Sequence, residues 1–184
     1  NELYGQLQPG TTMPVLLQKL GYKNHYVYTD STAFESEIIM LRKLNMSIIE
    51  KADFMKRKNP ETGEPYASFQ FGLDDVALVH ETQNILDSVQ EPFTMTAVMT
   101  NSHYPYHNPH PDQFNRFDNT KIRGRHRNGV DYGLHIADRI VEEFQKRDMA
   151  ERTLFILISD HGESFGERGA HGHSFSIYNE EVRV

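Results

Sequence analysis

The chain contains no cysteine, and this absence excludes disulfide bonds, thiolate zinc sites and cysteine nucleophiles from these residues. It also has no apolar stretch near the ~20 residues that cross a bilayer, and no signal peptide opens it. We therefore expect either a soluble protein or a targeting segment that lies outside these residues.

The motifs of several common catalytic and nucleotide-binding sites are absent as well. The sequence has no Gly-x-Ser-x-Gly nucleophile elbow, no P-loop and no Gly-x-Gly-x-x-Gly stretch. Its net charge of −7 comes without a long basic run, so nucleic acid is a poor candidate partner. No serine or threonine lies in a recognisable nucleophile setting.

What is present suits one globular domain, since the 184 residues are 38% hydrophobic and 11% aromatic. Apolar periodicity and turn residues predict helices at 13–20, 34–44, 76–89 and 134–146, strands at 25–29, 93–100 and 154–158, and a long loop at 101–129. The last strand, LFILI, is apolar throughout, as is typical of a strand covered on both faces. This order favours an α/β layered fold with a mostly parallel sheet flanked by helices.

Ligand-type side chains follow two of the predicted strands. The strand at 93–100 leads into NSHYPYH, and LFILI leads into SDHGESFGERGAHGHS. In open α/β sheets, ligands bind beyond the carboxyl ends of the strands. We therefore expect the two loops to meet at one pocket, with His103 and His161 facing a single cleft.

Asp160 and His161 form the first candidate pair. A carboxylate and an imidazole at a strand end can bind one divalent cation if Gly162 lets the backbone turn sharply. Oxygen and nitrogen ligands suit Zn, Mn, Mg or Ca, and the pattern leaves the choice open. The structural alternative is a helix N-cap in which Asp160 bonds backbone amides.

Other histidines and a basic cluster offer further candidates. His171 and His173 can be a second ligand set or donors to an anionic substrate oxygen, or simply solvated loop residues. His103, seen alone, is better explained as a surface histidine of a His-rich loop, and so are the histidines at 107, 110 and 126. The arginines at 123, 125 and 127 can bind phosphate or sulfate, although a solvated charge run explains them too.

The segment TLFILISDHGESFGERGAHGHSFSIYNEEVRV resembles the C-terminal signature of the sulfatase catalytic domain, within the alkaline phosphatase superfamily. That signature has an apolar strand, Ser/Thr-Asp-His-Gly-Glu, a glycine-rich stretch, a His or Lys, and then Tyr-x-Glu before a strand of the type Arg-Val-Pro. Upstream, TTMPVLLQKLGYKNHYVYT is similar to the segment that follows the nucleophile motif in this family. FGLDDVALVHETQNILDSVQEPFTMTAVMTNSHYPY is similar to lipoteichoic-acid-synthase-like and phosphoethanolamine-transferase-like members.

The resemblance implies a role for each matching residue. Asp160 and His161 match the two metal ligands of the late Asp-His-Gly motif. His103 matches the histidine that contacts the substrate anion. His173 falls where the family has a Lys or His contacting the transferred group or a second metal, and His171 is its rival for that role.

The resemblance also implies that residues 1–184 are a partial catalytic domain, incomplete at both ends. The family nucleophile lies upstream, as a formylglycine made from Cys or Ser or as an unmodified Thr, and the early acidic ligands lie there too. The expected fold is therefore an incomplete alkaline-phosphatase-like layered α/β fold. The polypeptide alone is expected to be inactive or nearly so.

The implied function is that of a metal-dependent hydrolase or transferase of sulfate or phosphate esters, acting through a covalent intermediate. The substrate is expected to be an ester that is glycan- or lipid-linked in some members, and the metal a divalent Ca, Zn, Mn or Mg ion. The domain is expected outside the cytoplasm, with membrane contact only through segments outside this chain. Two alternatives stay open: a degenerate member that binds an anion or a glycan, and an unrelated α/β domain.

Overall fold

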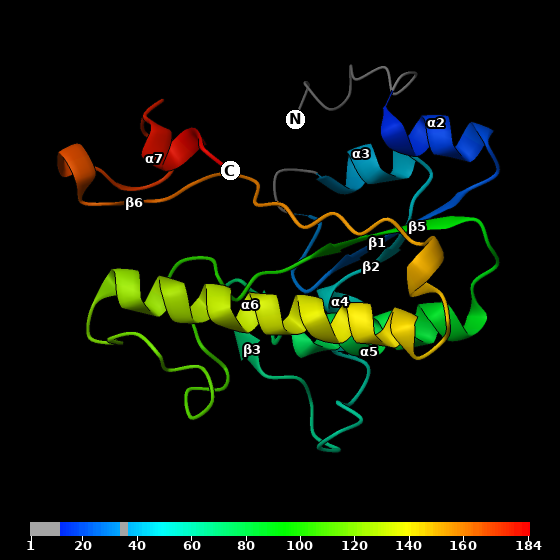
Figure 1. Cartoon of the computed structure of the whole chain (residues 1–184), viewed down its shortest axis with the longest axis horizontal. Helices are drawn as coiled ribbons and strands as arrows, with labels where there is room; N and C mark the ends of the chain where they lie inside the picture. The colour runs from blue at the N-terminus through cyan, green and yellow to red at the C-terminus, as the bar shows by residue number, and fades with distance from the viewer. Residues whose placement is uncertain (1–11, 34–36) are drawn as a thin grey trace.

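The computed structural model describes residues 12–33 and 37–184 (Figure 1). Its central sheet has three parallel strands in the order β2-β1-β5. These strands are β1 (Lys23–Tyr28), β2 (Ser47–Ile49) and β5 (Phe93–Val98). The predicted parallel sheet is confirmed, and the registers of β1 with both neighbours align the carboxyl ends of the three strands at one edge.

Helices cover the sheet on both sides (Figure 1). The helices are α2 (Met13–Lys19), α3 (Glu37–Lys43), α4 (Lys51–Phe54), α5 (Val76–Ser88), α6 (Ile122–Gln145) and α7 (Asn179–Val182), with 3-10 turns η3 (Ala150–Arg152) and η4 (Glu167–Gly169). Two short antiparallel pairs complete the structure: β3 (Ser68–Phe69) with β4 (Gly72–Leu73), and β6 (Ser164–Phe165) with β7 (His171–Gly172). The predicted α/β layered fold is confirmed. The start of the helix predicted at 34–44 lies outside the described residues.

The core lies between the sheet and the helices α5 and α6. Leu78 and Val79 of α5 and Ile136 of α6 are completely buried, because their apolar side chains recur on the helix faces that meet. The ring of Phe144 on α6 stacks on Phe93 of β5, with centroids 6.3 Å apart. Burial of this kind contributes roughly 1.5–3 kcal/mol for each large apolar side chain. No helix among the described residues is long and apolar enough to cross a membrane.

The long loop predicted at 101–129 is shorter than expected, because α6 already begins at Ile122. The first turns of α6 carry glycines and charged residues rather than an apolar stripe, so the sequence pattern does not predict them. Gly124 and Gly129 instead let loop backbone approach the helix closely. A Cβ at Gly124 would lie 2.0 Å from the carbonyl oxygen of Asp118, and one at Gly129 would lie 3.0 Å from that of Asn101. Tertiary packing therefore overrides a weak local signal here.

The strand predicted at 154–158 is not formed, and that prediction is wrong for this structure. The run follows η3 as a segment without regular secondary structure that passes along α6 and past the strands of the sheet (Figure 1). Leu154, Ile156 and Ile158 are 84%, 70% and 73% exposed. Phe155 contacts Phe144, with ring centroids 5.1 Å apart. Among the described strands none pairs with this run, and β5 pairs only with β1, so apolar composition alone does not make a buried strand.

Candidate functional site

A buried carboxylate fixes the ends of two parallel strands. Asp75 lies just before α5, and its Oδ1 accepts a hydrogen bond from the hydroxyl of Thr29 at 2.7 Å. The backbone amides of Thr100 and Asn101 donate to the same carboxylate at 3.0 Å and 2.9 Å. Burial raises the pKa of Asp75 to about 6, against the opposing effect of these hydrogen bonds. Asp75 thus holds together the residues that follow β1 and β5.

His103 is placed by the turn that Asp75 fixes. Its amide donates to the carbonyl oxygen of Thr100 at 2.9 Å, and its ring lies 4.6 Å from that of Phe71. The ring centroid of His103 is 5.9 Å from that of His173. A histidine that follows β5 therefore reaches the C-terminal segment of the chain.

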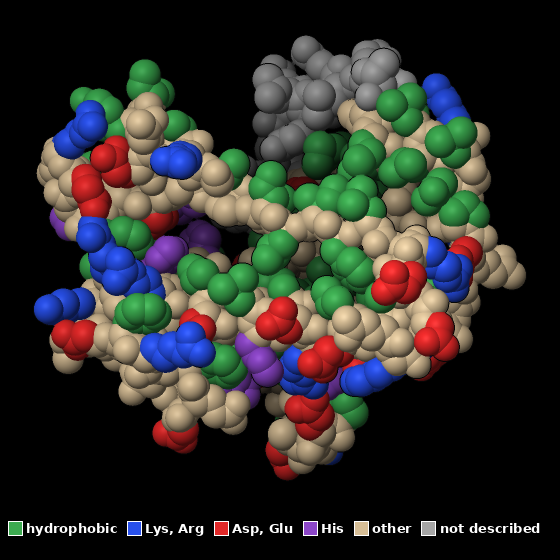
Figure 2. Space-filling model, in the orientation of Figure 1, with side chains coloured by type: hydrophobic (Ala, Val, Ile, Leu, Met, Phe, Trp, Pro, Cys, Tyr) green, Lys and Arg blue, Asp and Glu red, His purple; other side chains and the backbone are tan. Residues whose placement is uncertain are grey.

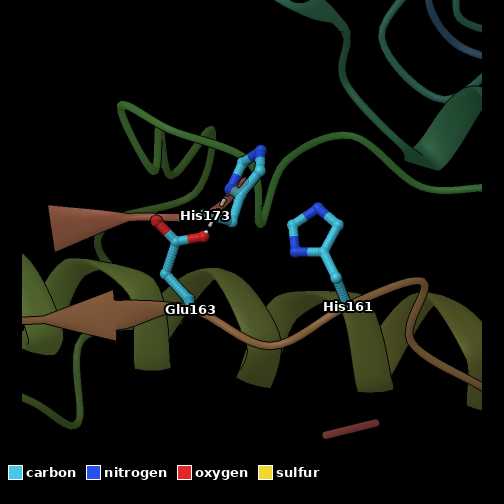
Figure 3. A group of neighbouring side chains, drawn as sticks. All are labelled: His161, Glu163 and His173. Atoms are coloured by element: carbon cyan, nitrogen blue, oxygen red, sulfur yellow. Dashed lines mark hydrogen bonds and ion pairs between the residues drawn. The ribbon is translucent and has the colours of Figure 1, made fainter. Parts of the chain in front are cut away.

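His161, Glu163 and His173 form the centre of the site (Figure 3). Each offers a ligand atom, and these atoms lie within 4.8 Å of one another. The rings of His161 and His173 are 3.9 Å apart between centroids. The β6–β7 pair, with Ser164 opposite Gly172, brings Glu163 and His173 together. Both loops thus contribute histidines to one place, as the sequence predicts.

The hydrogen bonds of the three histidines fix which ring nitrogen is free. Nδ1 of His103 lies 2.8 Å from the carbonyl oxygen of Tyr104, and Nδ1 of His161 lies 2.7 Å from that of Gly162. A carbonyl oxygen only accepts, so Nδ1 carries the hydrogen in both rings. Nδ1 of His173 lies 2.8 Å from Oε2 of Glu163 and donates to that carboxylate. In the neutral rings Nε2 is then the unprotonated nitrogen, which is the form that binds a metal ion.

Glu163 and Tyr106 are site residues that the sequence reasoning missed. The hydroxyl of Tyr106 donates to Oε1 of Glu163 at 2.7 Å, while Oε2 accepts from His173. Tyr106 is buried, and burial followed by this hydrogen bond raises the pKa of its hydroxyl. A signal existed for Glu163, since it lies two residues after His161, and residues at this spacing share a face of an extended chain. Nothing in the sequence pattern singles out Tyr106.

The remaining predicted residues lie at different distances from this centre. Asp160 is next to His161, with Oδ2 at 3.6 Å from Nε2, and its side chain is 87% exposed. His171 lies on β7 opposite Phe165 with its ring beside Gly166, outside the His161–Glu163–His173 group. The structure thus places His173, not His171, at the centre.

The other histidines of the long loop have partners of their own. His107 packs on Phe69 at 4.0 Å between ring centroids. Nε2 of His110 lies 3.0 Å from Oδ2 of Asp74. The ring of His126 packs between those of Tyr106 and Phe165, with centroids 5.2 Å and 4.9 Å away, and burial lowers the pKa of His126. Of the predicted basic cluster, Arg123 and Arg127 line a separate groove and Arg125 does not.

The donor set fits a divalent cation. Imidazole nitrogens with a neighbouring carboxylate suit zinc or manganese better than calcium or magnesium, which prefer oxygen ligands alone. Glu163 already accepts one hydrogen bond on each oxygen, so its carboxylate orients His173 and adds negative charge. Hydrogen bonds of this kind to metal-binding histidines fix ring orientation and raise ligand basicity.

Comparison with known proteins gives one family and several relatives. The family model described as Sulfatase matches residues 4–184. A phosphoethanolamine transferase, EptA of Salmonella typhimurium strain LT2, is 28% identical over 118 residues, covering 56% of this chain and 22% of the relative. The chain therefore spans about a fifth of the length of that protein.

Two solved structures share the fold. The lipoteichoic acid synthase LtaP from Listeria monocytogenes superimposes with a TM-score of 0.60 at 15% identity, covering 75% of this chain and 33% of that one. A protein of the alkaline phosphatase superfamily from Vibrio parahaemolyticus gives a TM-score of 0.56 at 18% identity, covering 76% and 34%. The match to the family model extends over nearly all of the sequence, and the chain belongs to the Sulfatase family.

Proposed function

We propose that this chain forms the metal- and anion-binding part of a domain that transfers or hydrolyses phosphate esters. Members of the family are hydrolases and transferases that act on sulfate or phosphate esters and use divalent metals. The observation that carries the proposal is that the ring of His173 lies beside those of His103 and His161, while the Nδ1 atoms of all three accept or donate hydrogen bonds within the described chain.

The residues divide into two groups by what surrounds them. His161 and the adjacent Asp160 are proposed to hold the metal ion, since an imidazole and a carboxylate lie side by side there. His103 and His173 are proposed to contact the oxygens of the phosphate group, because the ring of His173 lies beside that of His161 and the ring of His103 lies beside that of His173. When bound, a divalent cation would neutralise negative charge on the reacting oxygens and lower the pKa of a nucleophile.

His173 has the more precisely set position of the two anion-contacting residues. Its Nδ1–H bonds Glu163, which Tyr106 holds from the other side. Only Nε2 then remains, which donates a hydrogen bond to a substrate oxygen in the protonated ring and can bind a metal ion in the neutral ring. Oriented donors of this kind stabilise charge that develops on phosphoryl oxygens.

The nucleophile is proposed to come from residues outside this chain, since the sequence holds no recognisable nucleophile motif. Its oxygen would bond to phosphorus as the bond to the leaving alcohol breaks. A water or a second alcohol would then displace the nucleophile and release the product. The alternative, a member that binds an anion without turnover, predicts binding with no reaction.

Phosphate is proposed over sulfate because the relatives include a phosphoethanolamine transferase and a lipoteichoic acid synthase. The same resemblance supports a lipid- or glycan-linked ester as substrate and a position outside the cytoplasm. Any membrane contact is proposed to come from segments beyond these residues, and no role in nucleic-acid binding is proposed.

A metal titration of the 184-residue chain tests the metal site. Isothermal titration with zinc and with manganese is expected to show one site, and Asp160→Ala or His161→Ala is expected to weaken it at least ~10-fold. His135→Ala is the matched control, since His135 packs on Phe114 away from the cluster. Equal affinities of the parent and the His161→Ala chain would contradict the ligand assignment.

Activity is tested on the native protein purified from its source, with a phosphate diester and the corresponding sulfate ester offered in parallel. The proposal predicts turnover of the phosphate ester and its loss in His103→Ala. Turnover of the sulfate ester alone would contradict the choice of phosphate. Metal binding without turnover of either ester would support the non-catalytic alternative.

A further inference from the structure

The side chain of His103 is exposed, so its neighbours decide how its ring is oriented. Figure 2 shows histidine side chains at the opening between the C-terminal segment and α6, where solvent reaches them. Exposed side chains change rotamer rapidly unless a contact restricts them. The Nδ1–H of His103 bonds the carbonyl oxygen of Tyr104, which is the next residue of the same turn. The placing of the ring relative to the rest of the site therefore depends on residues from other segments.

Phe71, between β3 and β4, lies against the ring of His103. The two ring centroids are 4.6 Å apart, and the ring planes are inclined by 52°. The ring of His173 meets that of His103 edge-on at 5.9 Å. A phenyl ring has no polar atom that could bind a metal ion or an anion, so Phe71 can influence the chemistry only through the side chain that it touches.

The β3–β4 hairpin that carries Phe71 is fixed to the turn after β5, in which the histidine lies. Nδ2 of Asn101 donates to the carbonyl oxygen of Leu73 at 3.2 Å. Gly72 has a φ of +106°, and a Cβ there would lie 2.4 Å from Oγ1 of Thr100. Only glycine permits both this backbone conformation and this close approach. The phenyl ring and the imidazole are therefore held by one scaffold.

The space between the hairpin and this turn is too small for a substrate. Phe71 and His103 both line a hollow of about 10 Å³ there. A cavity of this size holds at most about one water molecule. The ring of Phe71 thus supports the histidine and does not form the wall of a ligand pocket.

The same hairpin carries a second stack of the same kind, which serves as an internal control. Phe69 packs on His107, with ring centroids 4.0 Å apart. Both phenylalanines are half-buried, and both histidines are exposed residues of one loop. His103 reaches the ring of His173, whereas in the described part of the chain no ring contact joins His107 to the site.

We propose that Phe71 is a positioning residue, which holds the ring of His103 so that Nε2 faces the anion site. The inference rests on the proposed function, in which that nitrogen contacts a phosphate oxygen. The phenyl ring restricts rotation of the imidazole, and the hydrogen bond to Tyr104 then keeps the hydrogen on Nδ1. An aromatic pair of this kind is stabilising enough to shift an orientational equilibrium about three- to tenfold.

The tautomer of His103 tests the positioning role without any ligand. In ¹⁵N NMR of the histidine-labelled chain, at a pH where the ring is neutral, the parent is expected to show His103 with its hydrogen on Nδ1. Phe71→Leu is expected to release the ring and to populate both tautomers, whereas Phe71→Tyr keeps an aromatic ring and the parental tautomer. Phe69→Leu is the matched control and is expected to leave the His103 signal unchanged. The signal is identified by its loss in His103→Ala, and circular dichroism checks the fold of each variant.

Phosphate affinity tests the consequence for the site. Titration of the zinc-loaded chain with inorganic phosphate is expected to show binding that is about three- to tenfold weaker in Phe71→Leu. Phe69→Leu is expected to change this affinity less than twofold. In a chain that already carries His103→Ala, Phe71→Leu is expected to cause no further loss, because its effect acts through that histidine.

Three results would overturn the inference: an unchanged tautomer in Phe71→Leu, equal effects of Phe71→Leu and Phe69→Leu, or an equal loss of phosphate affinity with and without His103. The last result would mean that Phe71 only stabilises the hairpin. Phosphate affinity that is unchanged in His103→Ala would contradict the proposed function instead, and the tautomer measurement would still decide whether Phe71 positions the ring.

Discussion

Asp75 gives the sharpest prediction, because its carboxylate is buried and joins the strand ends that position His103. Asp75→Asn is nearly isosteric. The side-chain oxygen of the new asparagine can still accept hydrogen bonds from the backbone amides of Thr100 and Asn101. The side-chain NH2 group can donate to the hydroxyl of Thr29. The variant therefore removes the titration while keeping the shape and most hydrogen bonds of the site.

The size of the effect follows from the pKa of Asp75. Burial raises this pKa from 3.8 to about 6, so the folded chain binds more protons than the unfolded chain between these values. The contribution of Asp75 to the free energy of unfolding is therefore fully present below pH 3.8 and is lost as the pH rises through 6. A difference of about 2 pH units corresponds to about 3 kcal/mol, a large fraction of the ~5–15 kcal/mol stability of a typical domain.

Urea unfolding of the parent and Asp75→Asn chains from pH 3.5 to 7.5 measures this effect. The stability of the parent relative to Asp75→Asn is expected to fall by about 3 kcal/mol across that range. Asp138→Asn, at an exposed position of α6, controls for the loss of one negative charge. A constant difference, or one that rises with pH, would show that the hydrogen bonds to the carboxylate match or outweigh the cost of burying it.

Three further predictions concern the site and the two regions where the structure departs from the sequence pattern. Glu163→Gln presents an amide NH2 to Nδ1 of His173, so the hydrogen of the neutral ring is expected to move to Nε2. ¹⁵N NMR distinguishes the two tautomers, and an unchanged tautomer would contradict the orienting role of Glu163. Leu157→Ala, at a side chain that is 65% exposed, is expected to lower the free energy of unfolding by under ~1 kcal/mol, whereas Ile136→Ala, at 0% exposure, is expected to lower it by about 2–5 kcal/mol. Equal losses in denaturant unfolding would mean that the LFILI run is buried. Gly124→Ala brings a methyl group against the backbone of the preceding loop and is expected to destabilise the chain by about 1–3 kcal/mol, and an unchanged melting temperature would disprove the close approach.

The sequence predicted the elements whose packing follows from their own periodicity. The strand near 25–29, the strand at 93–100 and the helix at 76–89 all have apolar residues at the spacing of the face they bury, and all three are found. The two histidine-bearing loops do meet, as predicted, but not for the reason predicted: only the loop with His103 follows a strand of the parallel sheet, while His161 and His173 lie around the separate β6–β7 pair.

The elements that the sequence did not predict depend on neighbours. The first turns of α6 form because glycines admit loop backbone, a contact that leaves no apolar pattern. LFILI has the composition of a buried strand, but a strand also needs a hydrogen-bonded neighbour, and within the described ranges none pairs with it. In the site, only the β6–β7 pairing distinguishes His173 from His171, which lie two residues apart in the sequence.

The account depends most directly on the claim that His161 and His173 belong to one metal- and anion-binding centre. X-ray absorption spectroscopy at the zinc edge, on the chain loaded with one equivalent of zinc, reports the ligands of the bound ion. The account predicts imidazole scattering with Zn–N distances of about 2.0–2.1 Å, and its reduction in His161→Ala. A zinc ion surrounded by oxygen alone, or a spectrum unchanged in His161→Ala, would contradict it.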